Sequence, residues 1–401
     1  MKLLIANVGS TSLKFKLFEM DAERVLASGR VERIGKGKAE LSFEPAGGVK
    51  VTLSLGKTDY RRAIGAALDC LRGDVLPDLS ELAAVGFKTV HTAGEKACVY
   101  ITPEVEAEMT SYNDIAPAHN PPYLTAIEIF RALLPKTPLV ALFEPAFHRD
   151  IPDHAYTYGI PYRWYAQYGI RRYGFHGASH RWVSERVPEL LERSREDLKI
   201  ISCHLGGSGS LCAMKGGVSV DTSMGFSLQT GIEHANRCGD IDPFIIPFVM
   251  RRERLTVDQV CETLNREGGL AGISGTSGDM RDVRKAAESG DYRAGLAIRL
   301  YAYGIKKYIG AYAAVLGGVD AIAFTGGIGE HDGALRARVC EGLKFLGLML
   351  DADKNQMLEG EGDIATDDSP GRILVVPANE EIVVAREVHR LIASGKGSSR
   401  P

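Results

Sequence analysis

The densest group of chemically capable side chains lies in the middle of the chain. RRYGFHGASH at 171–180 brings two arginines and two histidines within ten residues, and VDTSMGF, NRCGDIDP and SGTSGDMRDV follow it at 220–226, 236–243 and 274–283. Cations bracketed by glycines, with acids close by, are what phosphoryl transfer needs, because that chemistry relies on charge neutralisation and positioning. A lone histidine is more often a core or surface residue, and Asp-Met-Arg at 279–281 can be a helix cap with a surface cation. Neither alternative explains all the pieces together.

A glycine-serine pentapeptide occurs twice, as GSTSL at 9–13 and as GSGSL at 207–211. Each copy lies between two strand-like runs, which predicts a strand, a tight turn and a second strand. The successive amides and hydroxyls of such a turn can surround the oxygens of an anion. An ordinary hairpin turn explains either copy alone, but two copies at equivalent points of two domains favour phosphate binding.

A third glycine cluster, FTGGIGEHDG at 324–333, follows the strand-like run VDAIAF and precedes the helical pattern ALRARVCEGLKFL. In that setting the backbone amides at a helix N-terminus can receive a nucleotide. A plain turn between a strand and a helix is the alternative. The context and the two companion turns favour nucleotide binding.

Alternating apolar patterns predict an α/β fold with mixed sheets covered by helices. The first 55 residues read as several short strands, and later buried strands are AAVGFKTV, PLVALFE, KIISCHL, AIAFTG and RILVVPA. Helical patterns occur at 59–72, 122–134, 179–194, 256–266, 290–315 and 333–345. At 401 residues the chain exceeds the roughly 250–300 at which single cores stop growing, which favours two domains.

Composition argues against several functional classes. The net charge is −3 and the basic residues are scattered, so a nucleic-acid partner has little support. No apolar run approaches the ~18 residues of a membrane span, and the N-terminus lacks a signal-like pattern, so we expect a cytoplasmic protein without a membrane partner. The seven cysteines are odd in number and form no CxxC pair, which argues against a disulfide framework and against zinc.

The segments NVGSTSLKF, RRYGFHGASH, VDTSMGF, GDIDP, SGTSGDMRDV, FTGGIGE and PANEE resemble, in order, the signature segments of the acetate kinase family. These are short-chain carboxylate kinases of the actin/Hsp70/sugar-kinase superfamily, and the resemblance covers about 1–390. It implies a homodimer of chains with a two-domain, duplicated ribonuclease-H-like (actin-like ATPase) α/β fold. An interdomain cleft would hold ATP, Mg²⁺ (or Mn²⁺) and the small-molecule carboxylate. The expected domains are 1–149 with a C-terminal helix at about 382–393, and 150–381, followed by a disordered tail at 394–401.

The resemblance also implies roles for individual residues. Asn7 and Glu380 match the metal-site residues, and His176 and Arg237 match the catalytic pair that stabilises the transferring phosphoryl group. Arg237 can also hold the substrate carboxylate, and Phe175 is expected to line the acyl pocket. A carboxylate is already ionised at neutral pH, so its difficulty is repulsion from the γ-phosphate rather than the lack of a base. The nucleotide is assigned to Lys14, His204, Leu205, Gly206, Gly207, Ser208, Asp279, Met280, Arg281, Gly327, Ile328, Gly329, Glu330 and His331.

Four positions depart from the family pattern. Lys88 stands where the family has a substrate-binding arginine. A compact ammonium group therefore replaces a guanidinium that can form two parallel hydrogen bonds. Glu144 occupies the position at which the family has its catalytic aspartate, and its side chain is one methylene longer. Gly207 and His331 each replace an asparagine near the phosphates and the nucleotide.

The expected reaction is ATP plus acetate, or another short-chain carboxylate, to ADP plus acyl phosphate. The departures leave other readings open: a kinase of propionate, butyrate or a hydroxy acid, or one with a different phosphoryl donor. A nucleotide-dependent sensor without transferase activity is the alternative from another functional class.

Overall fold

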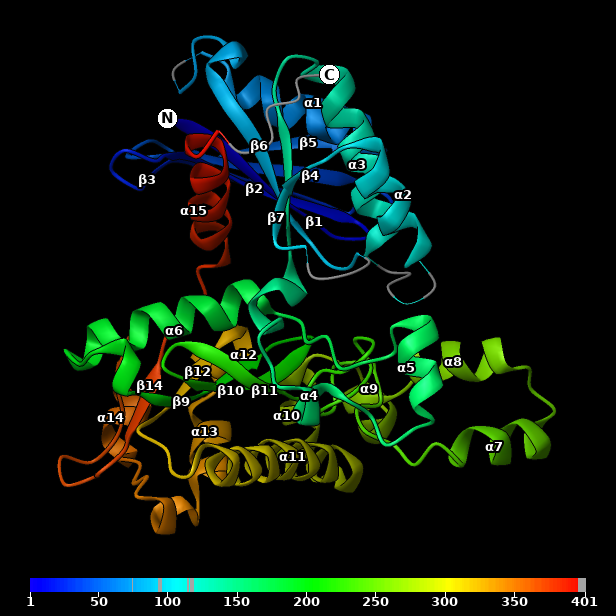
Figure 1. Ribbon diagram of the computed structural model, residues 1–401, viewed down its shortest axis with the longest axis vertical. Coiled ribbons are helices and arrows are strands. Elements are labelled where there is room, and N and C mark those ends of the chain that lie inside the picture. The colour runs from blue at the N-terminus through cyan, green and yellow to red at the C-terminus, as the bar shows by residue number, and fades with distance from the viewer. Residues whose placement is uncertain (74, 93–95, 114, 116–118, 396–401) are drawn as a thin grey trace. The chain divides into compact units, whose positions relative to one another are not determined.

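The computed structural model describes residues 1–73, 75–92, 96–113, 115 and 119–395 (Figure 1). The chain divides into two compact units: unit 1 contains Met1–Ala146 and Asn379–Pro401, and unit 2 contains Phe147–Ala378. These boundaries lie three residues from the expected ones, and the shift places Glu380 in unit 1 rather than in the second domain. Of the tail expected at 394–401, the segment 396–401 lies outside the described residues.

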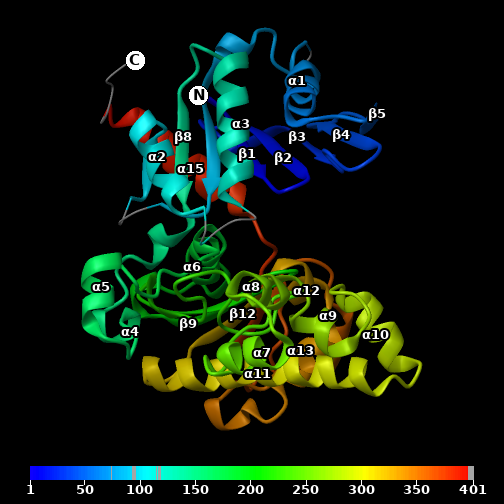
Figure 2. The same ribbon diagram turned by 90° about the vertical axis from the view of Figure 1, so that its right-hand side faces the viewer.

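Unit 1 is built on one mixed sheet (Figures 1 and 2). Its strands are β1 (Lys2–Val8), β2 (Ser12–Glu19), β3 (Arg24–Glu32), β4 (Ala39–Pro45), β5 (Val51–Gly56), β6 (Leu82–Thr89), β7 (Cys98–Tyr100) and β8 (Leu139–Phe143). The spatial order is β5-β4-β3-β2-β1-β6-β8-β7, and β1, β6 and β8 are parallel to one another. The strand-turn-strand expected around GSTSL is confirmed as the antiparallel β1–β2 hairpin.

Helices cover both faces of this sheet, which explains why β1, β6 and β8 are nearly continuous apolar runs. The helices of unit 1 are α1 (Tyr60–Leu71), α2 (Pro103–Ser111), α3 (Asn120–Leu133) and α15 (Glu380–Ala393). α15 packs on β1, β6 and β8, while α1 and α3 lie over the opposite face (Figure 2). A Cβ atom on Gly86 of β6 would lie 2.8 Å from Val388 Cγ2. Glycine at this position therefore lets α15 lie directly on the strand.

Unit 2 repeats the central topology of unit 1. Its strands are β9 (Lys199–Leu205), β10 (Gly209–Lys215), β11 (Val218–Thr222), β12 (Ala321–Thr325), β13 (Gly362–Asp363) and β14 (Arg372–Val375). The order is β11-β10-β9-β12-β14-β13, with a β9–β10–β11 antiparallel meander and parallel β9, β12 and β14. GSGSL lies at the β9–β10 turn and GSTSL at the β1–β2 turn, although GSTSL begins directly after β1 and GSGSL begins two residues after the end of β9. The duplication expected from the repeated pentapeptide is therefore present.

Alternating residues of β9 and β10 face two different helices. Ile201 packs in a core cluster with α11 (Tyr292–Leu316), whereas Ile200 packs in a separate cluster with α6 (Gly177–Leu191). Because side chains alternate along a strand, Ser202 shares the α6 face with Ile200. The same parity places Ser210 on the α6 face of β10, with Cys212. This alternation brings polar side chains of two strands beneath the start of α6.

The helices of unit 2 include several that the apolar patterns did not predict. Those expected are α6, α8 (Val257–Arg266), α11 and α13 (Gly333–Cys340). The others are α4 (Asp153–Tyr156), α5 (Tyr162–Tyr168), α7 (Ile245–Glu253), α9 (Gly269–Ser274), α10 (Met280–Glu288), α12 (Gly326–His331) and α14 (Ala352–Met357). Most of these are too short to show a helical period. Within the described part of the chain, no helix is long and apolar enough to cross a membrane.

Candidate functional site

In unit 1 the candidate residues gather at the carboxyl ends of the parallel strands. Asn7 lies near the end of β1, Lys88 near the end of β6, and Glu144 directly after β8. Parallel strands present their carboxyl ends at one edge of a sheet, where open α/β sheets bind ligands. Glu380 is the first residue of α15 and reaches the same edge through its contact with Lys88.

Lys88 links two acidic side chains. Its Nζ lies 3.1 Å from Glu144 Oε1 and 2.6 Å from Glu380 Oε2, and all three side chains are largely buried. Burial disfavours the ammonium form, but the two carboxylates outweigh that effect and raise the pKa of Lys88 well above its ordinary value. Lys88 is therefore a cation at neutral pH, between Glu144 and Glu380.

Tyr123 of α3 holds Asn7 and Val8 at the end of β1 in place. Its hydroxyl donates to Asn7 Oδ1 at 3.2 Å and accepts from the backbone N–H of Val8 at 3.1 Å. Burial raises the pKa of Tyr123, so the hydroxyl keeps its proton. Lys14, the cross-strand partner of Asn7 on β2, is exposed. Sequence reasoning missed Tyr123 because it occupies an ordinary apolar position of a helical pattern.

The oxygen atoms of this edge fit a magnesium-type ion. Mg²⁺ binds oxygen ligands and commonly takes one or two carboxylates, with phosphate oxygens and waters completing its shell. Asn7 supplies an amide oxygen and Glu380 a carboxylate. Across the described ranges no group of three or more His, Cys, Asp or Glu side chains is arranged to hold a metal ion. An ion held by Asn7 and Glu380 would need further oxygen ligands, such as phosphate oxygens and waters.

In unit 2 a cluster of histidines lies where α6 begins. His176 precedes α6 with φ 55° and ψ 30°, a left-handed conformation that costs a non-glycine residue about 1 kcal/mol. Such backbone strain commonly marks a functional position. The ring of His176 stacks on that of His204, at the end of β9, with centroids 4.2 Å apart. Both rings contact a serine hydroxyl at Nδ1, because Ser210 Oγ and Ser179 Oγ lie 2.8 Å from His176 and His204 respectively.

Arg237 lies beside the β9–β10 turn. Its Nη2 donates to Ser208 Oγ at 2.6 Å, so the arginine contacts the predicted phosphate loop directly. Burial lowers the pKa of Arg237 to about 10. The same turn is held by the buried His234, whose Nδ1 accepts from the backbone N–H of Gly209 at 3.0 Å. Burial lowers the pKa of His234 to about 3, so it is a neutral acceptor that shapes the loop.

Phe175, the residue assigned to the acyl pocket, is almost completely buried, with 1% of its surface exposed. Its carbonyl oxygen accepts from His148, whose Nε2 lies 3.0 Å away and whose Nδ1 contacts Ser219 Oγ at 2.8 Å. His148 therefore fixes the backbone immediately before His176.

The segment Asp279, Met280 and Arg281 forms the start of α10. Asp279 caps the helix by accepting from the backbone N–H of Arg281, as the helix-cap interpretation expected. The Arg281 side chain is 89% exposed and pairs with Asp279 at 2.5 Å. Met280 is buried in the core of unit 2, so its side chain packs against α11 and the sheet.

The glycine cluster forms the junction of β12 and α12. Gly326 has φ 76°, and a Cβ atom there would lie 2.7 Å from the carbonyl oxygen of Leu205 at the end of β9. Glycine is therefore required to bring this turn against the end of β9. The predicted nucleotide residues Gly327–His331 occupy the rest of α12.

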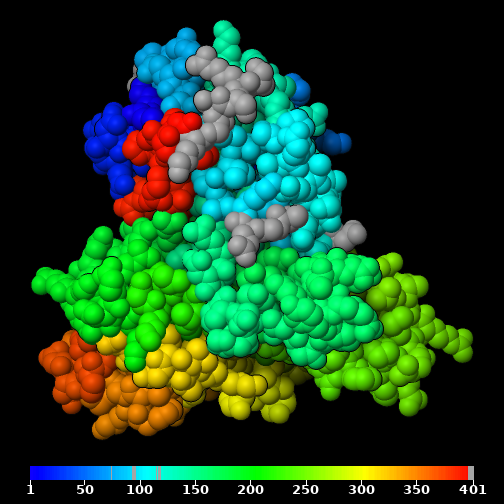
Figure 3. Space-filling view, viewed as in Figure 1, coloured from blue at the N-terminus to red at the C-terminus, as the bar shows by residue number. Residues whose placement is uncertain are grey.

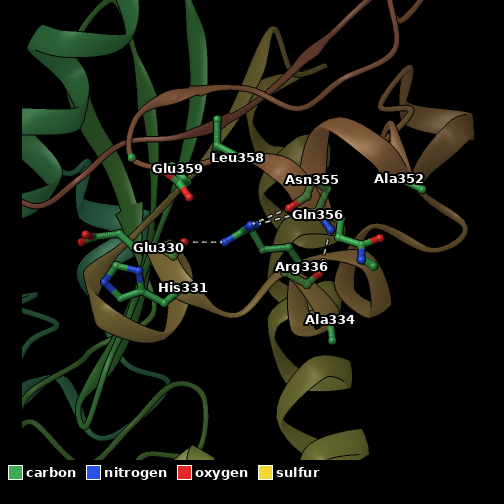
Figure 4. A pocket seen from close by; sticks show the side chains of 12 residues that line it. Glu330, His331, Ala334, Arg336, Ala352, Asn355, Gln356, Leu358 and Glu359 are labelled. Atoms are coloured by element: carbon green, nitrogen blue, oxygen red, sulfur yellow. Dashed lines mark hydrogen bonds between the residues drawn. The ribbon is translucent and has the colours of Figure 1, made fainter.

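Arg336 of α13 supports α12 from behind (Figure 4). Its buried guanidinium donates to the carbonyl oxygens of Gly329 and Glu330 at 2.8 and 2.7 Å, and to Asn355 Oδ1 of α14 at 2.8 Å. Arg336, Glu330 and Asn355 line a cavity of about 760 Å³ between α12, α13 and α14. Glu330 Oε1 in turn accepts from the backbone N–H of Ala378 at 3.0 Å. Arg336 was not anticipated, since nothing in a helical pattern distinguishes it from a surface arginine.

The structure thus collects the predicted residues in separate groups. Unit 1 holds the group of Asn7, Lys88, Glu144 and Glu380, and unit 2 holds His176, His204 and the GSGSL turn with Arg237. The nucleotide segments at α10 and α12 also belong to unit 2. The seven cysteines, all of which lie within the described residues, form no disulfide with one another.

Comparison with known proteins shows which family the chain belongs to. The model of the Acetokinase family matches residues 2–386. The acetate kinase of Alkaliphilus metalliredigens is 45% identical over 397 residues, which are 98% of this chain and 100% of that protein. The acetate kinase of Halothermothrix orenii is 46% identical over 399 residues, with the same coverage.

Two solved structures are similar to this chain over nearly its whole length. The crystal structure of Porphyromonas gingivalis acetate kinase is 38% identical and has a TM-score of 0.88, covering 98% of this chain and 99% of that one. A propionate kinase from Francisella tularensis is 32% identical with a TM-score of 0.89, covering 96% and 98%. The expected duplicated actin-like α/β fold is confirmed. The chain belongs to the acetokinase family, and it is therefore a phosphotransferase whose acceptor is a carboxyl group.

Proposed function

We propose that this protein transfers the γ-phosphoryl group of ATP to acetate or another short-chain carboxylate. A carboxylate oxygen forms a bond to the γ-phosphorus while the bond to the β,γ-bridging oxygen breaks, so that ADP and an acyl phosphate are released. The contact of Arg237 with Ser208 carries the proposal, because it brings a partly buried cation to the glycine-serine turn that suits a phosphate.

The side chains of unit 2 would act on the phosphoryl group. Arg237 and His176 are hydrogen-bond donors that can compensate the charge on its equatorial oxygens, where little covalent help is needed. The segments Gly206–Ser208 and Gly327–His331 would bind the phosphates and the adenosine. The stacking of His204 on His176 would limit rotation of the catalytic ring.

The side chains of unit 1 would serve the acceptor and the metal. Asn7 and Glu380 would hold Mg²⁺ or Mn²⁺, which when bound neutralises phosphate oxygens. Lys88 would attract the substrate carboxylate as a point charge, and Glu144 would orient Lys88. An acid larger than acetate is a specific second candidate, because a propionate kinase is among the close structural relatives.

The test is a hydroxamate assay with ATP and Mg²⁺ across formate, acetate, propionate, butyrate, glycolate and lactate, repeated with pyrophosphate as donor. We expect acyl hydroxamate from acetate or propionate. Binding of nucleotide without product from any acid would contradict the proposal and favour the sensor. Signal with pyrophosphate alone would leave the acceptor correct and the donor wrong.

We further propose a cytoplasmic homodimer that uses α5 and α7 for association. Tyr162 and Tyr168 on α5 are 68% and 59% exposed, and Phe244 and Phe248 beside and on α7 are 79% and 54% exposed. Aromatic side chains are enriched at protein interfaces. Figure 3 shows these segments at the surface of unit 2. Light scattering should give the mass of two chains, and Phe248→Glu should give that of one.

A further inference from the structure

A line of hydrogen bonds leads from the sheet of unit 2 to His176. His180, one turn later on α6, lies between two serines that the strand alternation turns toward that helix. Its Nδ1 is 2.9 Å from Ser202 Oγ and its Nε2 is 2.8 Å from Ser210 Oγ. Ser210 Oγ is also 2.8 Å from His176 Nδ1. His180 and both serines are completely buried, so water does not compete for these contacts.

The single proton of a serine hydroxyl restricts how this line can be arranged. Ser210 Oγ can donate to only one of the two histidines. Because the described residues offer this buried hydroxyl no third acceptor, we take it to donate to one histidine and to accept from the other. If it donates to His176 Nδ1, then His180 carries its proton on Nε2 and accepts from Ser202 at Nδ1. A neutral His176 then carries its own proton on Nε2. In the reversed order a neutral His176 has its proton on Nδ1 and a bare Nε2.

His180 is neutral, so it influences its neighbours through its tautomer rather than through a charge. Burial lowers its pKa well below the ordinary value, and the nearby His148 and His204 act in the same direction. His148 is also buried, and burial lowers its pKa to about 4. The middle of the line is therefore neutral imidazole, for which only the position of the proton can vary.

We propose that Ser210 and His180 are positioning residues that hold neutral His176 as its Nε2–H tautomer. This inference rests on the proposed function, because an N–H donor stabilises an anionic phosphoryl oxygen whereas a bare nitrogen repels it. The left-handed backbone of His176 and the stacked ring of His204 fix the direction of the imidazole. Together these contacts prepare the donor before the substrate arrives.

The direct test is the ¹⁵N spectrum of the histidines in the full-length protein without substrate, at about pH 8, where an ordinary histidine is neutral. The signals of His176 are identified by their loss in His176→Gln. We expect a protonated, pyrrole-type Nε2 and an unprotonated, pyridine-type Nδ1. A protonated Nδ1 with a bare Nε2 would overturn the inference. The tautomer is read from the wild-type spectrum, and only the assignment of its signals uses the His176→Gln variant.

Two variants in this line of hydrogen bonds, Ser210→Ala and Ser202→Ala, add a kinetic measurement. Ser210→Ala should lower kcat about 10²-fold through misplacement of the donor, with the KM values for ATP and carboxylate nearly unchanged. Ser202→Ala, two hydrogen bonds away from His176, should lower kcat about tenfold and shift the His176 signals toward the Nδ1–H tautomer.

The matched control is Ser184→Ala, a buried serine on the same helix whose hydroxyl donates to the carbonyl oxygen of Arg181. Equal kcat for Ser210→Ala and Ser184→Ala would overturn the inference. A wild-type protein without transferase activity would instead overturn the proposed function. The spectra separate the two cases, because they report the tautomer whether or not the reaction occurs.

Discussion

Lys88 Nζ lies 2.6 Å from Glu380 Oε2, although 292 positions separate the two residues in the chain. The contact ties the end of β6 to the start of α15. The same ammonium group also meets Glu144, so one cation serves two largely buried carboxylates.

Replacing Lys88 with methionine should destabilise unit 1 strongly. The change leaves two buried carboxylates without their cation, and breaking a buried pair in this way costs about 3–5 kcal/mol. Urea unfolding would measure it, and adding Glu144→Gln to Lys88→Met should restore part of the loss. The matched control is Lys16→Met, which removes a more exposed pair with Glu381 of the same helix and should cost under about 1 kcal/mol. Equal losses at the two lysines would contradict the buried-pair interpretation.

The stabilisation by Lys88 should depend on pH in one direction. The folded-state pKa of Lys88 is raised above the ordinary value of 10.5. The folded protein therefore binds this proton more tightly than the unfolded chain does, and the stabilisation is fully present below that ordinary value. It should be lost as the pH rises through the folded-state pKa. Unfolding of wild type and Lys88→Met at a series of alkaline pH values would show their difference shrinking, and a growing difference would refute the sign.

Arg237→Ala should lower kcat by about 10³-fold, as expected for an arginine that stabilises the transferring phosphoryl group. Its free energy of unfolding should be unchanged or higher at neutral pH, because burial already disfavours the charged guanidinium, as its lowered pKa shows. Rates and thermal unfolding are measured on the same preparation. Arg266→Ala, whose side chain is 73% exposed on α8, is the control. A loss of less than tenfold, or an unfolded variant, would exclude a catalytic role.

Arg336→Lys should raise the KM for ATP about tenfold while kcat and the KM for the carboxylate change little. A lysine keeps the charge but cannot reproduce the fork that holds the carbonyl oxygens of Gly329 and Glu330. Initial rates at varied ATP check this prediction. Arg338→Lys, two positions later and exposed, is the control. A fall in kcat alone would show that Arg336 does not act through nucleotide binding.

The sequence predicted features that depend on local pattern. The two hairpins, the long helices and the cap at Asp279 all follow from periodicity and turn residues. Tyr123 and Arg336 were not predicted because a tyrosine or an arginine is common in a helix. Their roles come from contacts with other elements: Tyr123 with β1, and Arg336 with α12 and α14. The line of hydrogen bonds through His180 depends on two serines from two strands. The Lys88–Glu380 pair depends on how the last helix returns to the first sheet, which no local pattern encodes.

The return of α15 to unit 1 sets an order for biosynthesis. The first 146 residues leave the ribosome before α15, the helix that packs over Gly86. One face of their sheet therefore stays uncovered until α15 has been synthesised. Unit 2 is translated completely in the meantime. Because Glu380 belongs to α15, we expect a chain that lacks this helix to be catalytically inactive, since Lys88 and Glu144 would stand without Glu380.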